Sequence, residues 1–233
     1  AAVILGSRGS SEFAEIPAGI SGGWDGYRGT PHLVRLFDFI NNDSPMASQI
    51  IDHRGIFFDK NRIIDITTSV TGTFTTEGWA VYKYTNMRSD GQAGSNTTFP
   101  DTDFPMFRLG DVYLMYAEAV ARGGQGGSMD SAVSYVNALR KRAYGDDSHA
   151  IDAKWLQANN YRNILDERGR ELYWEGVRRT DLIRYGLFTS SNYLWTFKGG
   201  VLGGVGVDSR YNVFPIPTTD ISVNANLHQN EGY

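Results

Sequence analysis

The chain has 233 residues, of which 41% are hydrophobic and 21% charged, and its formal net charge is −4. This length allows one large domain or two small ones, and the mild negative charge argues against an electrostatic nucleic-acid binder, whose surface would be basic. The absence of cysteine excludes disulfides, thiolate metal sites and cysteine nucleophiles.

The first part of the chain, residues 1–106, is predicted to be loop-rich, with one helix and short strands. A Gly/Ser-rich stretch ends at Gly29, after which Thr30 can cap a helix and Pro31 suits its first position. Apolar residues then recur at helical spacing as far as Ile40. Extended segments are predicted at residues 56–58, 63–66 and 79–84.

From Phe107 onward the sequence pattern becomes typical of helices. One apolar stripe runs from Leu109 to Val120 and stops at a glycine-rich turn. Ser128 can cap a second helix, which Gly145 ends. Two helices joined by a short turn make an antiparallel hairpin of tetratricopeptide type, and a single such unit must pack on something else.

A third helix is predicted over roughly residues 161–185. Glu171 and Glu175 lie within reach of Arg168 and Arg179 at helical spacing, so we expect an ion-pair network that stabilises this helix. Beyond a glycine-rich stretch, the alternating prolines of residues 214–217 favour an extended segment outside any central strand.

Four blocks of the sequence carry a family resemblance. They are FRLGDVYLMYAEA at 107–119, VNALRKRA at 136–143, ILDERGRELYWEGVRRTDLIRYG at 164–186, and FPIP at 214–217 with NLHQNEGY at 226–233. In this order they resemble the C-terminal half of SusD/RagB proteins. Glu231 stands where that family usually has proline.

The resemblance implies a mainly α, SusD-like fold, with a tetratricopeptide-type helical hairpin, loop-rich segments and a few short strands. It divides the chain into a loop-rich, ligand-facing region at 1–106 and the C-terminal helical region at 107–233. It also implies non-catalytic capture of nutrient glycans by an outer-membrane, surface-exposed lipoprotein, whose lipidated cysteine lies outside this chain. The implied partners are a SusC-like TonB-dependent transporter, the glycan ligand and the N-terminal half of the same protein.

A sugar-binding site needs a flat aromatic platform beside planar polar side chains, because the apolar face of a pyranose loses its water against the ring. The best local match is the glycine-flanked segment that holds Trp24, Asp25, Tyr27 and Arg28. Trp79 and Trp195 are the next candidate platforms, and each of these aromatic residues has an ordinary packing role as its alternative.

Catalytic and cofactor chemistry finds little support in the sequence. Glu167, Glu171 and Glu175 share a helical face but alternate with arginines, which favours ion pairs over the paired carboxylates of a glycosidase. The glycine runs match neither a P-loop nor a dinucleotide fingerprint, and the histidines lack the spacing of a zinc motif, so we predict no enzyme, cofactor or metal site. The alternatives are a glycoside hydrolase on a helical scaffold, a transporter lid without glycan affinity, and a peptide-binding member of the family.

Overall fold

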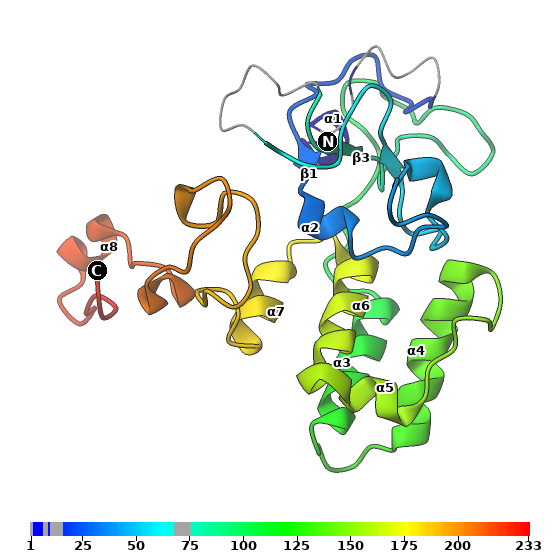
Figure 1. Cartoon of the computed structure of the whole chain (residues 1–233). Coiled ribbons are helices and arrows are strands. Elements are labelled where there is room, and N and C mark those ends of the chain that lie inside the picture. The colour runs from blue at the N-terminus through cyan, green and yellow to red at the C-terminus, as the bar shows by residue number, and fades with distance from the viewer. Residues whose placement is uncertain (1, 7–8, 10–15, 68–75) are drawn as a thin grey trace. The chain divides into compact units, whose positions relative to one another are not determined.

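The computed structural model describes residues 2–6, 9, 16–67 and 76–233 (Figure 1). The chain forms two compact units, Ala1–Arg178 and Arg179–Tyr233.

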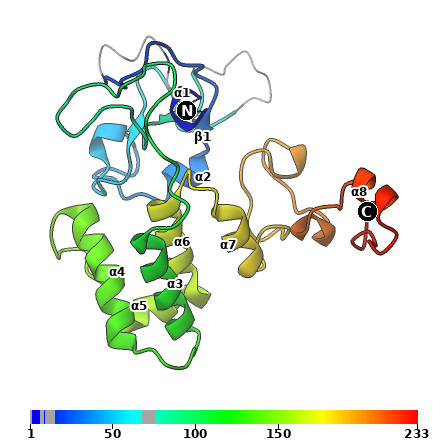
Figure 2. The ribbon, with the colours of Figure 1, turned by 180° about the vertical axis from the view of Figure 1, so that it is seen from behind.

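The first unit contains the predicted helical hairpin, formed by α3 (Leu109–Ala121) and α4 (Met129–Tyr144) (Figures 1 and 2). The Ser128 hydroxyl accepts a hydrogen bond from the backbone N–H of Ser131 at 3.1 Å, and Gly145 ends α4 at a φ of +87°. Both ends of α4 therefore lie where the sequence predicted them. Two further helices pack with the hairpin: α5 (Ala153–Gln157) and α6 (Arg162–Leu172).

The core of these four helices consists of aliphatic side chains with almost no exposure. Small residues lie where α3 and α4 meet, which lets the two backbones approach closely. The buried members are Leu114, Ala117, Ala121, Ala132, Val136, Leu139, Leu156, Ile164 and Leu172.

The single helix predicted over residues 161–185 is wrong, because α6 ends at Leu172 and five residues separate it from α7 (Arg178–Arg184). Tyr173 turns to an extended conformation, and Trp174 and Gly176 have φ angles of +64° and +78°. The Tyr173 hydroxyl donates a hydrogen bond to the backbone oxygen of Arg54 at 2.6 Å. Packing of Tyr173 against the loop-rich part of the chain thus overrides the helical periodicity of this segment.

That loop-rich part contains less regular structure than predicted. Among its described residues, the helices are the single turns α1 (Ala2–Leu5) and α2 (Pro31–Val34) and the 3-10 turn Ala47–Gln49, so the helix expected to reach Ile40 ends early. A three-stranded antiparallel sheet has the order β1–β3–β2, with strands Arg28–Gly29, Trp79–Val81 and Phe57–Phe58. The predicted segment 63–66 forms only an isolated bridge, between Ile63 and Glu77.

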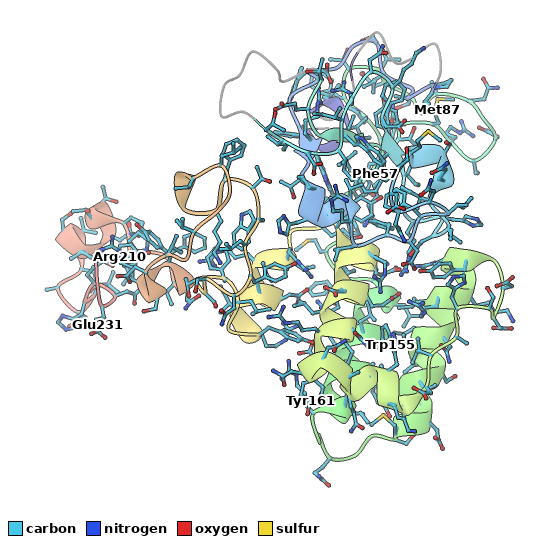
Figure 3. All side chains as sticks on the ribbon, in the orientation of Figure 1. Phe57, Met87, Trp155, Tyr161, Arg210 and Glu231 are labelled. Atoms are coloured by element: carbon cyan, nitrogen blue, oxygen red, sulfur yellow. The ribbon has the colours of Figure 1, made fainter. Side chains whose placement is uncertain are left out.

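A second core fills the space between this sheet and the end of α6. In Figure 3 the labelled Phe57 lies in this part of the unit, and its ring stacks on that of Tyr173 with 5.7 Å between centroids. The buried members are Val34, Phe37, Phe39, Phe57, Ile64, Trp79, Val81 and Tyr173. The boundary between the two compact units lies after Arg178. The change of composition near residue 107 therefore falls inside the first unit.

The second unit holds the rest of α7, the 3-10 turns Lys198–Gly200 and Ser209–Asn212, and the short helix α8 (Thr218–Val223). The proline-containing segment 214–217 is extended, and side chains from the end of the chain satisfy its backbone. Gln229 bonds both the N–H and the oxygen of Ile216, at 2.8 and 2.9 Å, and Asn230 donates to the oxygen of Phe214 at 2.7 Å.

Candidate ligand-binding site

The predicted segment 24–28 lies in the first unit, where backbone hydrogen bonds hold it in place. The N–H of Trp24 donates to the oxygen of Leu5, and those of Gly26 and Tyr27 both donate to the oxygen of Gly6, each at 2.7 Å. Asp25 adopts a φ of +50°, a left-handed conformation that aspartate tolerates better than most residues. These hydrogen bonds fix the backbone of the segment, and so they fix the positions from which its side chains extend.

Two aromatic rings of this segment are open to solvent. Trp24 is 64% exposed and Tyr27 is 48% exposed. The Tyr27 ring packs on the ring of Trp174, with 5.6 Å between centroids and a tilt of 59°. The segment therefore offers an exposed indole ring and a phenol ring whose orientation is fixed by packing on Trp174. Such rings suit stacking against the apolar face of a sugar.

The same segment carries a carboxylate with two cationic neighbours. Asp25 accepts a hydrogen bond from Arg28 at 2.7 Å and lies 3.4 Å from a guanidinium nitrogen of Arg62. Both guanidinium groups are buried and the carboxylate is partly exposed. The partly exposed Asp25 carboxylate, held by these two guanidinium groups, can accept hydrogen bonds from ligand hydroxyls.

Trp79, in contrast, does not belong to this site. It lies in the central strand β3, is only 2% exposed, and packs edge-on against Phe39 with 6.0 Å between ring centroids. A ring buried in this way has no face to offer to a ligand. The expectation that Trp79 is a binding platform is therefore corrected: it is a core residue.

Trp195 lies in the second unit and is half-buried in a cluster of its own. Phe188 stacks on it at 5.9 Å, and Lys198 places its ammonium 4.5 Å from the ring centroid. Lys198 is itself buried and donates to the backbone oxygens of Leu187 and Tyr193, at 3.2 and 2.7 Å, and of Ser190. The predicted residues are thus four in one segment, one in the core and one in the other unit.

The carboxylates of α6 form an ion-pair network, as predicted, but with other partners than expected. Glu167 pairs with Arg54, Arg140 and Arg170, at 2.7 to 2.8 Å. Burial by itself would raise the pKa of Glu167, but the charges of Arg170, Arg54 and Arg140 outweigh burial and lower this pKa to about 2. Arg168, expected to pair within its own helix, reaches Asp111 of α3 at 2.8 Å.

Among the residues described, no group of three or more His, Asp or Glu side chains could hold a metal ion. The Asp101 carboxylate is engaged by Ser95, whose backbone nitrogen and hydroxyl lie 2.5 and 2.8 Å away. Nor does any helix in the described ranges have the length and apolar character needed to cross a membrane.

Sequence reasoning missed two contributors to the site, Trp174 and Arg62. Trp174 falls inside the helix predicted over residues 161–185, yet it lies in the break after α6 and packs on Tyr27. The Trp-Glu-Gly order at 174–176 was the available signal, because a glycine commonly follows the end of a helix. Arg62 reaches Asp25 from 37 residues away, and no spacing rule predicts such a contact.

Comparison with known proteins gives consistent matches. A model of the SusD family matches residues 65–233. The starch-binding protein SusD of Bacteroides thetaiotaomicron is 46% identical over 158 residues, which are 68% of this chain and 26% of that protein. A SusD-like protein of Formosa agariphila is 33% identical over 139 residues, or 55% of this chain and 24% of that protein.

Solved structures resemble the fold at lower identity. Surface glycan-binding protein A of B. thetaiotaomicron aligns with a TM-score of 0.63 at 19% identity, covering 98% of this chain and 46% of that one. Its complex with laminarihexaose aligns with a TM-score of 0.62 at 20% identity over the same shares. The chain thus spans about a quarter of these curated relatives and just under half of these structures.

Proposed function

Because the chain belongs to the SusD family, we propose that it captures a nutrient oligosaccharide or polysaccharide without cleaving it. The observation that carries this proposal is the segment 24–28, which holds the exposed Trp24, the ring of Tyr27 packed on Trp174, and the Asp25 carboxylate bonded by Arg28. Aromatic faces with fixed polar groups at their edge match the mixed apolar and hydroxylated surface of a sugar.

A starch-type α-glucan is the first ligand to test. The relative SusD is named as a starch-binding protein and is 46% identical over the matched region. A β-glucan is the second, since a structural neighbour is known in complex with laminarihexaose.

The same family membership supports a proposal for the place of action. We propose that the protein is held at the cell surface of the outer membrane by a lipid anchor outside this chain, and that it passes its glycan to a SusC-like TonB-dependent transporter. Trp195, on the second unit, remains a separate proposed sugar contact.

The N-terminal half of the protein is the remaining proposed partner. The outer side of α3 and the residues before it expose large apolar side chains: Met106, Phe107, Leu109, Val112 and Met115. A helix that is apolar on several faces is normally covered on all of them. Since the structural neighbours are about twice as long as this chain, we propose that further tetratricopeptide-like helices cover this apolar face of α3.

Absence of catalysis is part of the proposal. A glycosidase acid needs a carboxyl group with a raised pKa facing a second carboxylate across a cleft. The pKa of Glu167 and that of Glu171 are both lowered to about 2. Burial does raise the pKa of Asp166, but Arg178 lies 3.9 Å from this carboxylate, and Asp166 lies on α6, outside the Trp24 segment.

Native affinity electrophoresis tests the proposal. The protein runs through gels that contain starch, laminarin or no polysaccharide, alongside a Trp24→Ala variant. Starch should retard the protein, and loss of a central aromatic contact should weaken the retardation by about tenfold or more. Ile40→Ala, which removes another exposed apolar side chain (76% exposed), is the matched control. Absence of retardation on a broad panel indicates the transporter lid or the peptide binder, and degradation of the polysaccharide indicates the hydrolase.

A further inference from the structure

A pocket lies at the corner where α4 leads into α5, away in sequence from the Trp24 segment. Its volume is about 440 Å³, within the range of about 300–1,000 Å³ that small-molecule sites occupy. In Figure 3 the labelled Trp155 lies on α5 in this part of the first unit. The pocket is lined by Arg140, His149, Ala150, Ile151, Asp152 and Trp155.

Arg140 is the fixed element of this pocket. It is only 8% exposed, its Nε donates to the backbone oxygen of His149 at 2.6 Å, and its Nη1 donates to Glu167 at 2.7 Å. Its guanidinium carbon lies 5.0 Å from the ring centroid of Tyr144 and 5.4 Å from that of Trp155. These contacts hold the guanidinium in place before any ligand arrives.

Four lining residues keep a polar atom that makes no hydrogen bond within the described part of the chain. Two of these atoms are donors, Nη2 of Arg140 and Nε1 of Trp155. One is an acceptor, the second carboxylate oxygen of Asp152, whose first oxygen accepts from the N–H of Trp155 at 2.9 Å. The fourth is Nε2 of His149, whose Nδ1 lies 2.8 Å from the Ser148 hydroxyl.

This set of groups selects the charge of a ligand. The carboxylate of Asp152 would repel an anionic ligand, and the guanidinium of Arg140 would repel a cationic one. A hydroxyl group, which both donates and accepts, can use the donors and the acceptors together. The indole of Trp155 adds an apolar wall of the kind that a sugar ring packs against.

We propose that the pocket between α4 and α5 binds a single neutral pyranose unit, as a second sugar site in the first unit. The site uses its own groups and none of the Trp24 segment. It gives the protein a separate contact with a glycan, and two linked contacts bind a polymer more tightly than either does by itself.

The five tryptophans allow both sites to be observed in one experiment. The 233-residue chain is labelled with ¹⁵N at its tryptophan side chains, and single Trp→Phe variants assign the five indole N–H signals. The probes are methyl α-D-glucopyranoside, methyl α-D-mannopyranoside and methyl β-D-galactopyranoside. We expect at least one of them to shift the Trp155 signal in a saturable manner, while the signal of the core residue Trp79 stays in place.

Asp152→Asn is the variant that tests the assigned contacts. Asparagine caps a helix as well as aspartate does, so α5 keeps its N-cap while the free acceptor becomes a donor. We expect the affinity for the pyranoside to fall by about tenfold, the effect of one lost hydrogen bond in a site of this kind.

Three results would overturn the inference. The first is a Trp155 signal that none of the three pyranosides moves, and the second is an unchanged affinity in Asp152→Asn. The third is tighter binding of methyl glucuronate than of the neutral sugars, which indicates an anion site. The Trp24 signal, followed with maltoheptaose, reports on the proposed function separately, so failure at one site is distinguishable from failure at the other.

Discussion

Glu171 on α6 receives hydrogen bonds from three arginines of three different segments. Arg54 comes from the loop-rich part, Arg108 from the residue before α3, and Arg142 from α4, with donor–acceptor distances of 2.6 to 2.9 Å. Burial would raise the pKa of Glu171, but the hydrogen bonds and charges of these arginines lower it to about 2. A single buried carboxylate therefore links three parts of the first unit.

This linkage predicts a pH dependence of stability. The folded-state pKa of Glu171 lies below its ordinary value of 4.5, so its contribution is fully present above pH 4.5 and is lost as the pH falls toward 2. We expect Glu171→Gln to lower the free energy of unfolding at pH 7 by about 3 kcal/mol, because three arginines lose a buried counterion. Urea unfolding of both proteins between pH 7 and pH 3 measures this effect.

The variant should also show a weaker dependence on pH than the wild-type chain. Glu231→Gln, at an exposed position, is the control and should leave the curve unchanged. Equal pH dependence in wild type and Glu171→Gln would contradict the assigned role of Glu171.

The sequence predicted that this network exists but not which residues form it. Helical spacing pointed to partners on the same helix, whereas Arg54 and Arg108 reach Glu171 across 117 and 63 residues. The same limit applies to the candidate site. The sequence ranked Trp24 first and Trp79 next as candidate platforms, but it did not show that strand pairing buries Trp79 while Trp24 stays in a loop.

Among the elements, the break between α6 and α7 has the most consequences. It lets Tyr173 enter the core of the loop-rich part, and it places Trp174 behind Tyr27 of the candidate site. Gly176 completes the break at a φ of +78°, a conformation that residues with a Cβ atom adopt at a cost.

Gly176→Ala isolates this backbone effect. An added Cβ at Gly176 would meet no atom within 4 Å, so any loss of stability reports the φ angle alone. We expect the free energy of unfolding to fall by about 1–2 kcal/mol. Gly26→Ala, where φ is not positive and the nearest atom lies 3.7 Å from the added Cβ, is the control and should be close to neutral. Thermal unfolding followed by circular dichroism compares the two, and an equal loss in both would contradict the assignment.

The elements that the sequence predicted best are those with local signals at both ends. Ser128 and Gly145 marked α4 correctly, because a cap and a left-handed glycine act within one turn of the helix. The interruption after Leu172 and the short α2 could not be predicted in this way, since contacts with distant segments decide both.

At the scale of the whole molecule, the apolar face of α3 connects this chain with the larger protein that its relatives represent. Met106 is 79% exposed and Met115 is 49% exposed. If the N-terminal half packs there, both sulfur atoms lose contact with solvent. Met46, which is 44% exposed and lies outside this face, provides an internal reference.

Methionine oxidation by dilute peroxide, read by mass spectrometry, tests this arrangement. In the 233-residue chain, all three methionines should oxidise readily. When the N-terminal half is present, we expect Met106 and Met115 to oxidise at least several-fold more slowly, with Met46 unchanged. Equal rates with and without that half would show that it does not cover α3.

Capture of a glycan without cleavage is tested most directly by calorimetric titration of the chain with maltoheptaose, followed by an assay of the same sample for new reducing ends. We predict saturable binding, at least about tenfold weaker in Trp24→Ala, and no new reducing ends. New reducing ends would contradict a binding role, and equal affinity in the variant would contradict the placement of the sugar on Trp24.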